Sequence, residues 1–138
     1  MTEEKARPRV VIADDHPEMV ARAATLLREE FDVVATAHNG TEALECIRSL
    51  DPDIVLLDLY MPGMSGLEVI RTLRTSGIRS MAVIMTGYND SDLASAAIVA
   101  GAMAFVTKAQ LIDDLLPAMR AAVQGTIFVS PSTTAKGS

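Results

Sequence analysis

The sequence predicts an α/β fold in which helices cover both faces of one parallel sheet. Five short apolar runs recur along the chain and alternate with stretches of helical periodicity. The runs are continuously apolar, which is typical of parallel strands that are buried on both faces. Because crossovers between parallel strands are right-handed, the intervening helices are expected on both sides of the sheet, as a doubly wound (βα)5 unit.

The five predicted strands are rich in Val and Ile, which favour the pleated conformation. They are expected at Val10–Ala13, Val33–Ala37, Ile54–Leu57, Met81–Met85 and Ala104–Val106. The fourth is the weakest candidate, because methionine is a poorer strand former than Val or Ile.

Amphipathic stretches follow the strands. Helices are expected over Pro17–Glu29, Thr41–Leu50, Ser65–Arg74, Ser91–Ala100 and a last segment that includes Leu115–Val123. Pro17 suits a first helical turn, Ser65 and Glu68 have the spacing of a capping box, and Gly125 is a predicted C-terminal cap. Pro117 is unfavourable inside a helix, so we expect a kink there or a helix that begins late.

Length and composition narrow the class of protein. The 138 residues suit a single domain, which we place at residues 1–126, with residues 127–138 as a polar tail or the start of a linker. The single cysteine, Cys46, excludes an internal disulfide and a cysteine-based zinc site. A net charge of −6 and the lack of a basic stripe argue against nucleic-acid binding by this segment. No signal peptide or membrane-spanning run is present, so a cytoplasmic location without membrane contact is expected.

Polar residues with complementary chemistry follow four of the predicted strands. Asp14 and Asp15 follow the first strand, Asp58 the third, Thr86 the fourth and Lys108 the fifth. Ligands of open α/β sheets bind beyond the carboxyl ends of the strands, so these side chains are expected to meet there. Three carboxylates would repel each other unless a hard cation such as Mg²⁺, with Mn²⁺ as an alternative, joined them. An ammonium and a hydroxyl beside such a cation predict a phosphoryl-binding site in which one carboxylate is the nucleophile.

Placed in this order, the residues resemble the receiver domain of two-component response regulators. Asp14 and Asp15 resemble the family's acidic pair, Asp58 its phospho-acceptor, Thr86 its switch hydroxyl and Lys108 its lysine. The resemblance is strengthened by the loop Asp58–Gly66, which matches D-x-x-M-P-x-x-x-G, and by Phe105 at the aromatic switch position. The segments Asp14–Pro17 and Gly125–Pro131 look most like the NarL/FixJ (LuxR-type) group.

The resemblance implies a role for each site residue. Asp15 and Asp58 would ligate Mg²⁺ directly, Asp14 directly or through water, and Tyr60 through its backbone carbonyl. Lys108 would contact Asp58 and then the phosphoryl group, while Thr86 and the backbone N–H of Gly87 would bind phosphoryl oxygens. The fold implied is the flavodoxin-like (CheY-like) sheet with strand order 2-1-3-4-5.

The function implied is a signalling switch rather than an enzyme with a separate substrate. A sensor histidine kinase would phosphorylate Asp58, Thr86 would move toward the phosphoryl oxygens, and Phe105 would fill the space that Thr86 leaves. The surface of the helix Ser91–Ala100, the fifth strand and the last helix would then control homodimerisation or an output domain outside this chain, which would contact DNA and regulate transcription.

Alternative functions and departures from the family pattern also bear on this interpretation. A receiver-like module that binds proteins without phosphorylation stays open, whereas a haloacid-dehalogenase-type phosphatase is disfavoured because Tyr60 stands where that family needs a second aspartate. Ala109 replaces the proline that follows the family's lysine, so a trans Lys108–Ala109 bond is expected. The rings of Tyr60 and Tyr88 beside the site are expected to hinder water and slow autodephosphorylation.

Overall fold

The structure, a computed structural model, describes residues 7–131 of the chain and contains every strand and helix that the sequence predicts. The strands are β1 (Arg9–Ala13), β2 (Asp32–Ala37), β3 (Ile54–Asp58), β4 (Met81–Thr86), β5 (Ala102–Thr107) and β6 (Phe128–Val129). The helices are α1 (Pro17–Leu27), α2 (Gly40–Leu50), α3 (Gly66–Thr75), α4 (Ser91–Ala100) and α5 (Leu111–Gln124), with a 3₁₀ turn, η1 (Lys108–Gln110), before α5.

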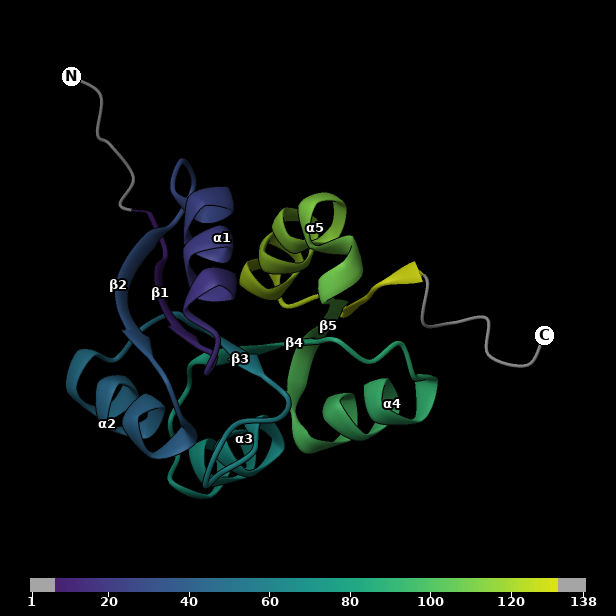
Figure 1. Ribbon diagram of the computed structural model, residues 1–138. Helices are drawn as coiled ribbons and strands as arrows, with labels where there is room; N and C mark the ends of the chain where they lie inside the picture. Colours follow the sequence, from purple (N-terminus) through teal and green to yellow (C-terminus); the bar gives the residue numbers. More distant parts are fainter. Residues whose placement is uncertain (1–6, 132–138) are drawn as a thin grey trace.

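The strands form one sheet in the order β2-β1-β3-β4-β5-β6, and all neighbouring pairs are parallel. The predicted order 2-1-3-4-5 is therefore confirmed, with β6 as an additional edge strand. Figure 1 shows α1 and α5 on one face of the sheet and α2, α3 and α4 on the other. This is the doubly wound α/β architecture, in which the carboxyl ends of the strands share one edge.

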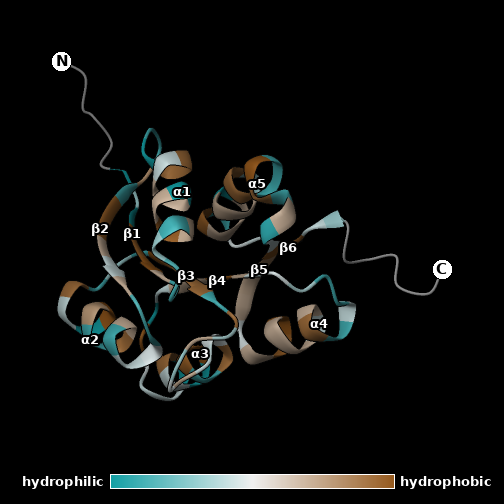
Figure 2. Cartoon of the chain, in the orientation of Figure 1, coloured by the Kyte–Doolittle hydropathy of each residue, from teal (hydrophilic) through white to brown (hydrophobic). Residues whose placement is uncertain are grey.

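Each strand contributes side chains to two hydrophobic cores, which explains why the apolar runs are continuous. Val11 and Ala13 of β1 belong to the core under α2, α3 and α4, whereas Val10 and Ile12 belong to the core under α1 and α5. Figure 2 shows the apolar residues concentrated along the strands and on the inward sides of the helices. Because successive strand side chains point to opposite faces, two buried faces require an apolar residue at every position.

The predicted helix ends are largely confirmed. Ser65 caps α3 in a reciprocal capping box with Glu68, and Gly125 ends α5 in the left-handed conformation with φ 76°. A late start of the last helix was wrong, because α5 begins at Leu111 and continues through Pro117. Proline at this position removes one backbone donor within the helix.

The two-residue strand β6 lies inside the segment that we expected to be a tail or linker. Phe128 and Val129 pair with Ala104 and Phe105 of β5. Residues 132–138, the remainder of that segment, and residues 1–6 lie outside the described range. Within residues 7–131, no helix combines the length and apolar character that a bilayer crossing requires.

Candidate functional site

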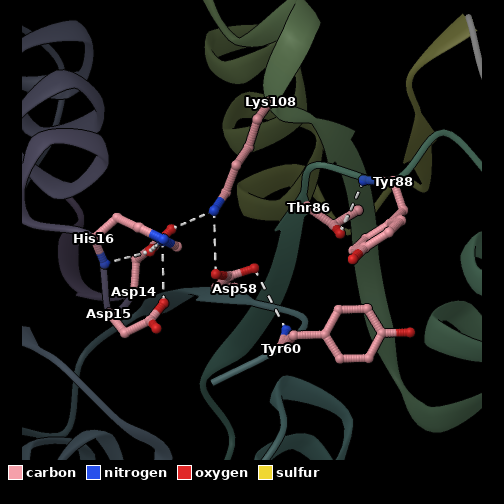
Figure 3. A network of polar contacts seen from close by, with 8 residues as sticks. All are labelled: Asp14, Asp15, His16, Asp58, Tyr60, Thr86, Tyr88 and Lys108. Atoms are coloured by element: carbon pink, nitrogen blue, oxygen red, sulfur yellow. Dashed lines mark hydrogen bonds and ion pairs between the residues drawn. The ribbon is translucent and has the colours of Figure 1, made fainter. Parts of the chain in front are cut away.

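The predicted site residues gather at the carboxyl edge of the sheet. Asp14 follows β1, Asp58 is the last residue of β3, and Lys108 begins the η1 turn after β5. Figure 3 shows the Lys108 side chain reaching from above toward both carboxylates. The order β1-β3-β4-β5 brings these residues together because each parallel strand delivers its C-terminal residue to the same edge.

Lys108 forms ion pairs with two buried carboxylates. Its Nζ lies 2.8 Å from Oδ2 of Asp14 and 3.1 Å from Oδ2 of Asp58. The residue-level exposure is 0% for Asp14 and 5% for Asp58. An unpaired carboxylate in such a place would lose its hydration without compensation, so the ammonium is a necessary partner for both groups.

Burial and crowding shift the protonation equilibria at the site. Burial, and then the neighbouring charge of Asp14, raises the pKa of Asp58 above the usual carboxyl range, although Lys108 opposes this shift. Burial would lower the pKa of Lys108, but hydrogen bonding and attraction from Asp14 and Asp58 outweigh it, so that the pKa of Lys108 is raised. One cation therefore compensates the carboxylates only in part, and the site favours additional positive charge.

Asp15 and His16 complete a compact group of candidate metal ligands. One ligand atom each from Asp14, Asp15, His16 and Asp58 can be chosen so that all lie within 4.8 Å of one another. The backbone N–H of His16 donates to Oδ1 of Asp14 at 2.8 Å, and its Nδ1 lies 3.2 Å from Oδ1 of both Asp14 and Asp15. Three carboxylates from two strand ends are hard oxygen donors and suit Mg²⁺ or Mn²⁺, so the residues present fit the predicted cation.

The loop after Asp58 is held close to the end of β3. The backbone N–H of Tyr60 lies 3.4 Å from Oδ1 of Asp58, a long hydrogen bond. A Cβ on Gly66 would lie 2.5 Å from the carbonyl oxygen of Asp58, so this position requires glycine. This close approach explains the glycine in the predicted loop motif. The metal-ligand role of the Tyr60 carbonyl remains a prediction.

Thr86 and Gly87 lie at the same edge, one strand along. The hydroxyl of Thr86 accepts a hydrogen bond from the backbone N–H of Tyr88 at 3.2 Å, and Figure 3 shows this bond on the side of Thr86 away from Lys108. Among residues 7–131, no hydrogen bond joins Thr86 or Gly87 to Asp58, so their contact with phosphoryl oxygens remains a prediction.

The predicted switch residue Phe105 is fully buried in the core under α2, α3 and α4. In this arrangement its side chain already lies inside the protein. An inward movement of Phe105 is therefore not visible here and remains a prediction.

Two exposed tyrosine rings lie beside the site. Tyr60 and Tyr88 make an edge-to-face contact with ring centroids 5.3 Å apart and an interplanar angle of 82°. Figure 3 shows both rings on the side of Asp58 opposite to Asp14 and Asp15. Together the two rings form an aromatic wall next to the carboxylate of Asp58. A wall in this place is what hindrance of an attacking water requires, and that hindrance remains a prediction.

Two further features near the site are the peptide bond after Lys108 and the buried residue Ser130. No cis peptide bond occurs between residues 7 and 131, so the Lys108–Ala109 bond is trans, as expected. Ser130, which lies in the segment that composition predicts to be a polar tail, directly follows β6 and is fully buried beside the end of β5. The pair Phe128–Val129 was the available signal, but two apolar residues before a serine do not distinguish a strand from a linker.

Comparisons with known proteins point to one family. Residues 10–120 match the family model described as the response regulator receiver domain. A putative transcriptional regulator of Pseudomonas aeruginosa is 38% identical over 121 residues, which are 86% of this chain and 58% of that protein. The nitrate/nitrite response regulator protein NarL of Escherichia coli K12 is 34% identical over 127 residues, 91% of this chain and 59% of NarL.

A solved structure shows the same fold. The crystal structure of a LuxR-family two-component response regulator from Aurantimonas sp. SI85-9A1 superposes with a TM-score of 0.87 at 33% identity, covering 93% of each chain. The chain thus spans less than two thirds of the length of the two curated relatives, at 58% and 59%. The NarL-like and LuxR-like character expected from the sequence is confirmed.

Proposed function

The chain belongs to the response regulator receiver domain family, and on this premise we propose that it is a phosphorylation-dependent switch with Asp58 as the phospho-acceptor. A receiver domain is a signalling module rather than an enzyme with a separate substrate. The observation that carries the proposal is the meeting of Asp58, Asp14 and Lys108 at the carboxyl edge, with Lys108 Nζ 3.1 Å from Oδ2 of Asp58.

In the proposed reaction, a carboxylate oxygen of Asp58 attacks the phosphorus atom of a phosphohistidine on a sensor histidine kinase. The bond from phosphorus to the histidine nitrogen breaks, and the nitrogen leaves with the electron pair while an aspartyl-phosphate forms. Lys108 supplies positive charge beside Asp58, where negative charge gathers during the transfer. A serine or asparagine at position 58 would lack the carboxylate nucleophile.

Asp14, Asp15 and Asp58, with the carbonyl of Tyr60, would hold the Mg²⁺ or Mn²⁺ ion. A bound divalent cation would neutralise charge on the phosphoryl oxygens. The chain's own residues do the remaining work. Asp14 keeps Lys108 in place through the 2.8 Å ion pair, and Gly66 lets the loop that carries Tyr60 lie close to Asp58.

We assign the output of the switch to the α4, β5 and α5 surface. Thr86 and Phe105 lie on the neighbouring strands β4 and β5, where Thr86 pairs with Thr107 and Phe105 pairs with Ile84. A shift of the Thr86 hydroxyl from the Tyr88 N–H to a phosphoryl oxygen would change the start of α4. Val99 is 86% exposed on α4, which leaves an apolar side chain for contact with a second copy or an output domain.

The Pseudomonas aeruginosa relative is a putative transcriptional regulator, and both it and NarL are longer than this chain. Control of transcription through a further DNA-binding domain is therefore part of the proposal. The alternative is a receiver-like module that binds partners without phosphorylation. Because the acidic group and Lys108 are both present, the phosphorylated switch is favoured.

The test is the intact mass of the protein after incubation with acetyl phosphate or phosphoramidate. We expect one phosphoryl adduct with Mg²⁺, none with EDTA, and none for Asp58→Asn. The control is Asp113→Asn, which removes an exposed carboxylate of α5 and should leave the adduct unchanged. If neither these donors nor a phosphorylated histidine kinase modifies the folded wild-type protein, the module acts without phosphorylation.

A further inference from the structure

The buried hydroxyl of Ser130 joins the end of β5 to the start of α5. Ser130 is 0% exposed and follows β6 directly. Its hydroxyl accepts a hydrogen bond from the backbone N–H of Thr107 at 3.1 Å and donates one to Oδ2 of Asp114 at 2.7 Å. Thr107 is the last residue of β5, and Asp114 lies in the first turn of α5.

The hydroxyl extends the hydrogen bonding of a very short strand. Phe128 and Val129 pair with β5, and the backbone N–H of Ser130 then donates to the carbonyl of Phe105 at 2.9 Å. At the next donor along β5, the N–H of Thr107, the Ser130 side chain supplies the acceptor. Since Thr107 is buried, its N–H needs an acceptor within the protein.

The two residues held by Ser130 stand on either side of the turn that carries Lys108. The turn η1 covers Lys108–Gln110, and neither η1 nor α5 has a side-chain hydrogen bond at its N-cap. The position of Lys108 Nζ, 2.8 Å from Asp14 and 3.1 Å from Asp58, depends on the path of this turn.

We propose that Ser130 is a positioning residue for the phosphoryl-transfer site, because its hydroxyl fixes both ends of the turn that presents Lys108. This inference rests on the proposed function. The hydrogen bonds of Ser130 connect the turn that carries Lys108 to the segment in which the chain leaves the sheet. Displacement of the exit segment would therefore change the placement of Lys108.

The chain offers a matched control at the opposite edge of the sheet. Ser80 is also buried, at 2% exposure, and its hydroxyl donates to the carbonyl of Pro52 at 2.7 Å. Ser130→Ala and Ser80→Ala each remove a buried hydroxyl, so both are expected to lower the midpoint of urea unfolding. We expect Ser130→Ala alone to slow phosphorylation by acetyl phosphate at saturating Mg²⁺, by about tenfold, as misplaced catalytic groups do.

A second pair of variants tests the other end of the bridge. Asp114→Asn keeps a carbonyl oxygen that can accept from Ser130, whereas Asp114→Ala keeps no acceptor. Both remove the charge at the start of α5, so a difference between them reports the hydrogen bond. We expect the rate of Asp114→Asn to stay near that of the wild type and the rate of Asp114→Ala to fall toward that of Ser130→Ala.

The outcomes separate this inference from the proposed function. A wild-type protein that takes up no phosphoryl group from a small donor or a kinase would overturn both. A normal wild-type rate that Ser130→Ala leaves unchanged, or that Ser80→Ala lowers equally, would overturn only the role of Ser130. If Ser130→Ala does not fold, the Asp114 pair decides, and equal rates for Asn and Ala would overturn the proposal.

Discussion

The two edges of the sheet differ in how their polar and charged groups are paired. At the amino edge, charged and polar groups meet complementary partners. The backbone N–H of Arg9 donates to Asp53, and the guanidinium of Arg74 donates to the carbonyls of Ile78, Ser80 and Gly101. At the carboxyl edge, by contrast, three carboxylates lie close together, and the ammonium of Lys108 pairs with two of them, Asp14 and Asp58.

This difference separates residues that hold the fold together from residues that serve a reaction. The amino edge satisfies backbone groups at the starts of strands and the ends of helices, so its bonds contribute to stability. At the carboxyl edge, burial and the Asp14 charge raise the pKa of Asp58, which means that the ionised form is disfavoured by its surroundings. Groups kept at such a disadvantage are characteristic of functional sites.

Removal of the ammonium is expected to have the largest effect on stability. Lys108→Met would leave the buried carboxylates of Asp14 and Asp58 without their cation, and loss of one partner of a buried pair costs about 3–5 kcal/mol. We expect a decrease of this order in the free energy of unfolding, measured by urea denaturation in EDTA.

Two controls accompany this variant. The double variant Lys108→Met/Asp58→Asn should regain part of the loss because one buried charge is gone. Excess Mg²⁺ should narrow the difference from the wild type if the carboxylates bind it. Equal stability of Lys108→Met and wild type in EDTA would contradict the view that the ammonium compensates these carboxylates.

Loss of hydrogen bonds at the amino edge should lower stability but leave phosphorylation unchanged. Arg74→Met would remove the donor to three carbonyl oxygens, and hydrogen bonds to charged groups contribute about 1.5–3 kcal/mol when buried. Because Arg74 is exposed, we expect a smaller loss of about 1 kcal/mol. Arg71→Met, at an exposed arginine of the same helix, is the matched control. A clear change in the phosphorylation rate of Arg74→Met would contradict the view that the amino edge contributes only to stability.

The pH dependence of stability should differ between wild type and Asp58→Asn. Because the pKa of Asp58 is raised in the folded state, the folded protein binds this proton more tightly than the unfolded chain does. The contribution of Asp58 to stability is therefore greatest at low pH and is lost as pH rises from the ordinary carboxyl range through the raised pKa. In EDTA, the wild type should lose up to about 1.4 kcal/mol per pH unit relative to Asp58→Asn in this window. If stability changes with pH in the same way in the wild type and in Asp58→Asn, the pKa of Asp58 is not raised by folding.

The smallest effect is expected from the aromatic wall at the carboxyl edge. Tyr60→Ala and Tyr88→Ala remove rings that contact each other beside Asp58. If these rings hinder an attacking water, each variant should shorten the half-life of the phosphorylated protein severalfold, as measured by intact mass after removal of the donor. Tyr60→Phe and Tyr88→Phe keep the rings and serve as controls. An unchanged half-life in both alanine variants would refute the shielding role.

The sequence allowed much of the fold and the main site to be predicted for a physical reason. Strands buried on both faces are continuously apolar, and the final residues of parallel strands lie at one edge of the sheet, so the sequence alone predicts that Asp14, Asp58 and Lys108 lie together. Their pairing could not be predicted in detail. The resemblance pointed to Asp58 as the partner of Lys108, whereas the shorter distance is to Asp14, because side-chain reach depends on the turn after β5.

The missed features depend on few residues or on tertiary contacts. β6 has only two residues, too few for a periodic pattern, and its position depends on pairing with the edge of β5, a tertiary contact. The sequence left open whether Pro117 kinks the last helix or delays its start, and in the structure the apolar contacts of Leu111 and Leu115 with the core hold α5 from Leu111 onward. Packing therefore outweighed a local helix-breaking preference.

The edge strand β6 also determines where the domain can be truncated or fused to another protein. An unpaired strand edge offers free backbone donors and acceptors to other chains and is a recognised cause of aggregation. In the described structure, Phe128, Val129 and Ser130 cover part of that edge on β5. A fragment that stopped at residue 126, where composition alone placed the boundary, would uncover it. Fusion proteins and truncated forms are therefore expected to stay monodisperse only when the segment through Ser130 is retained.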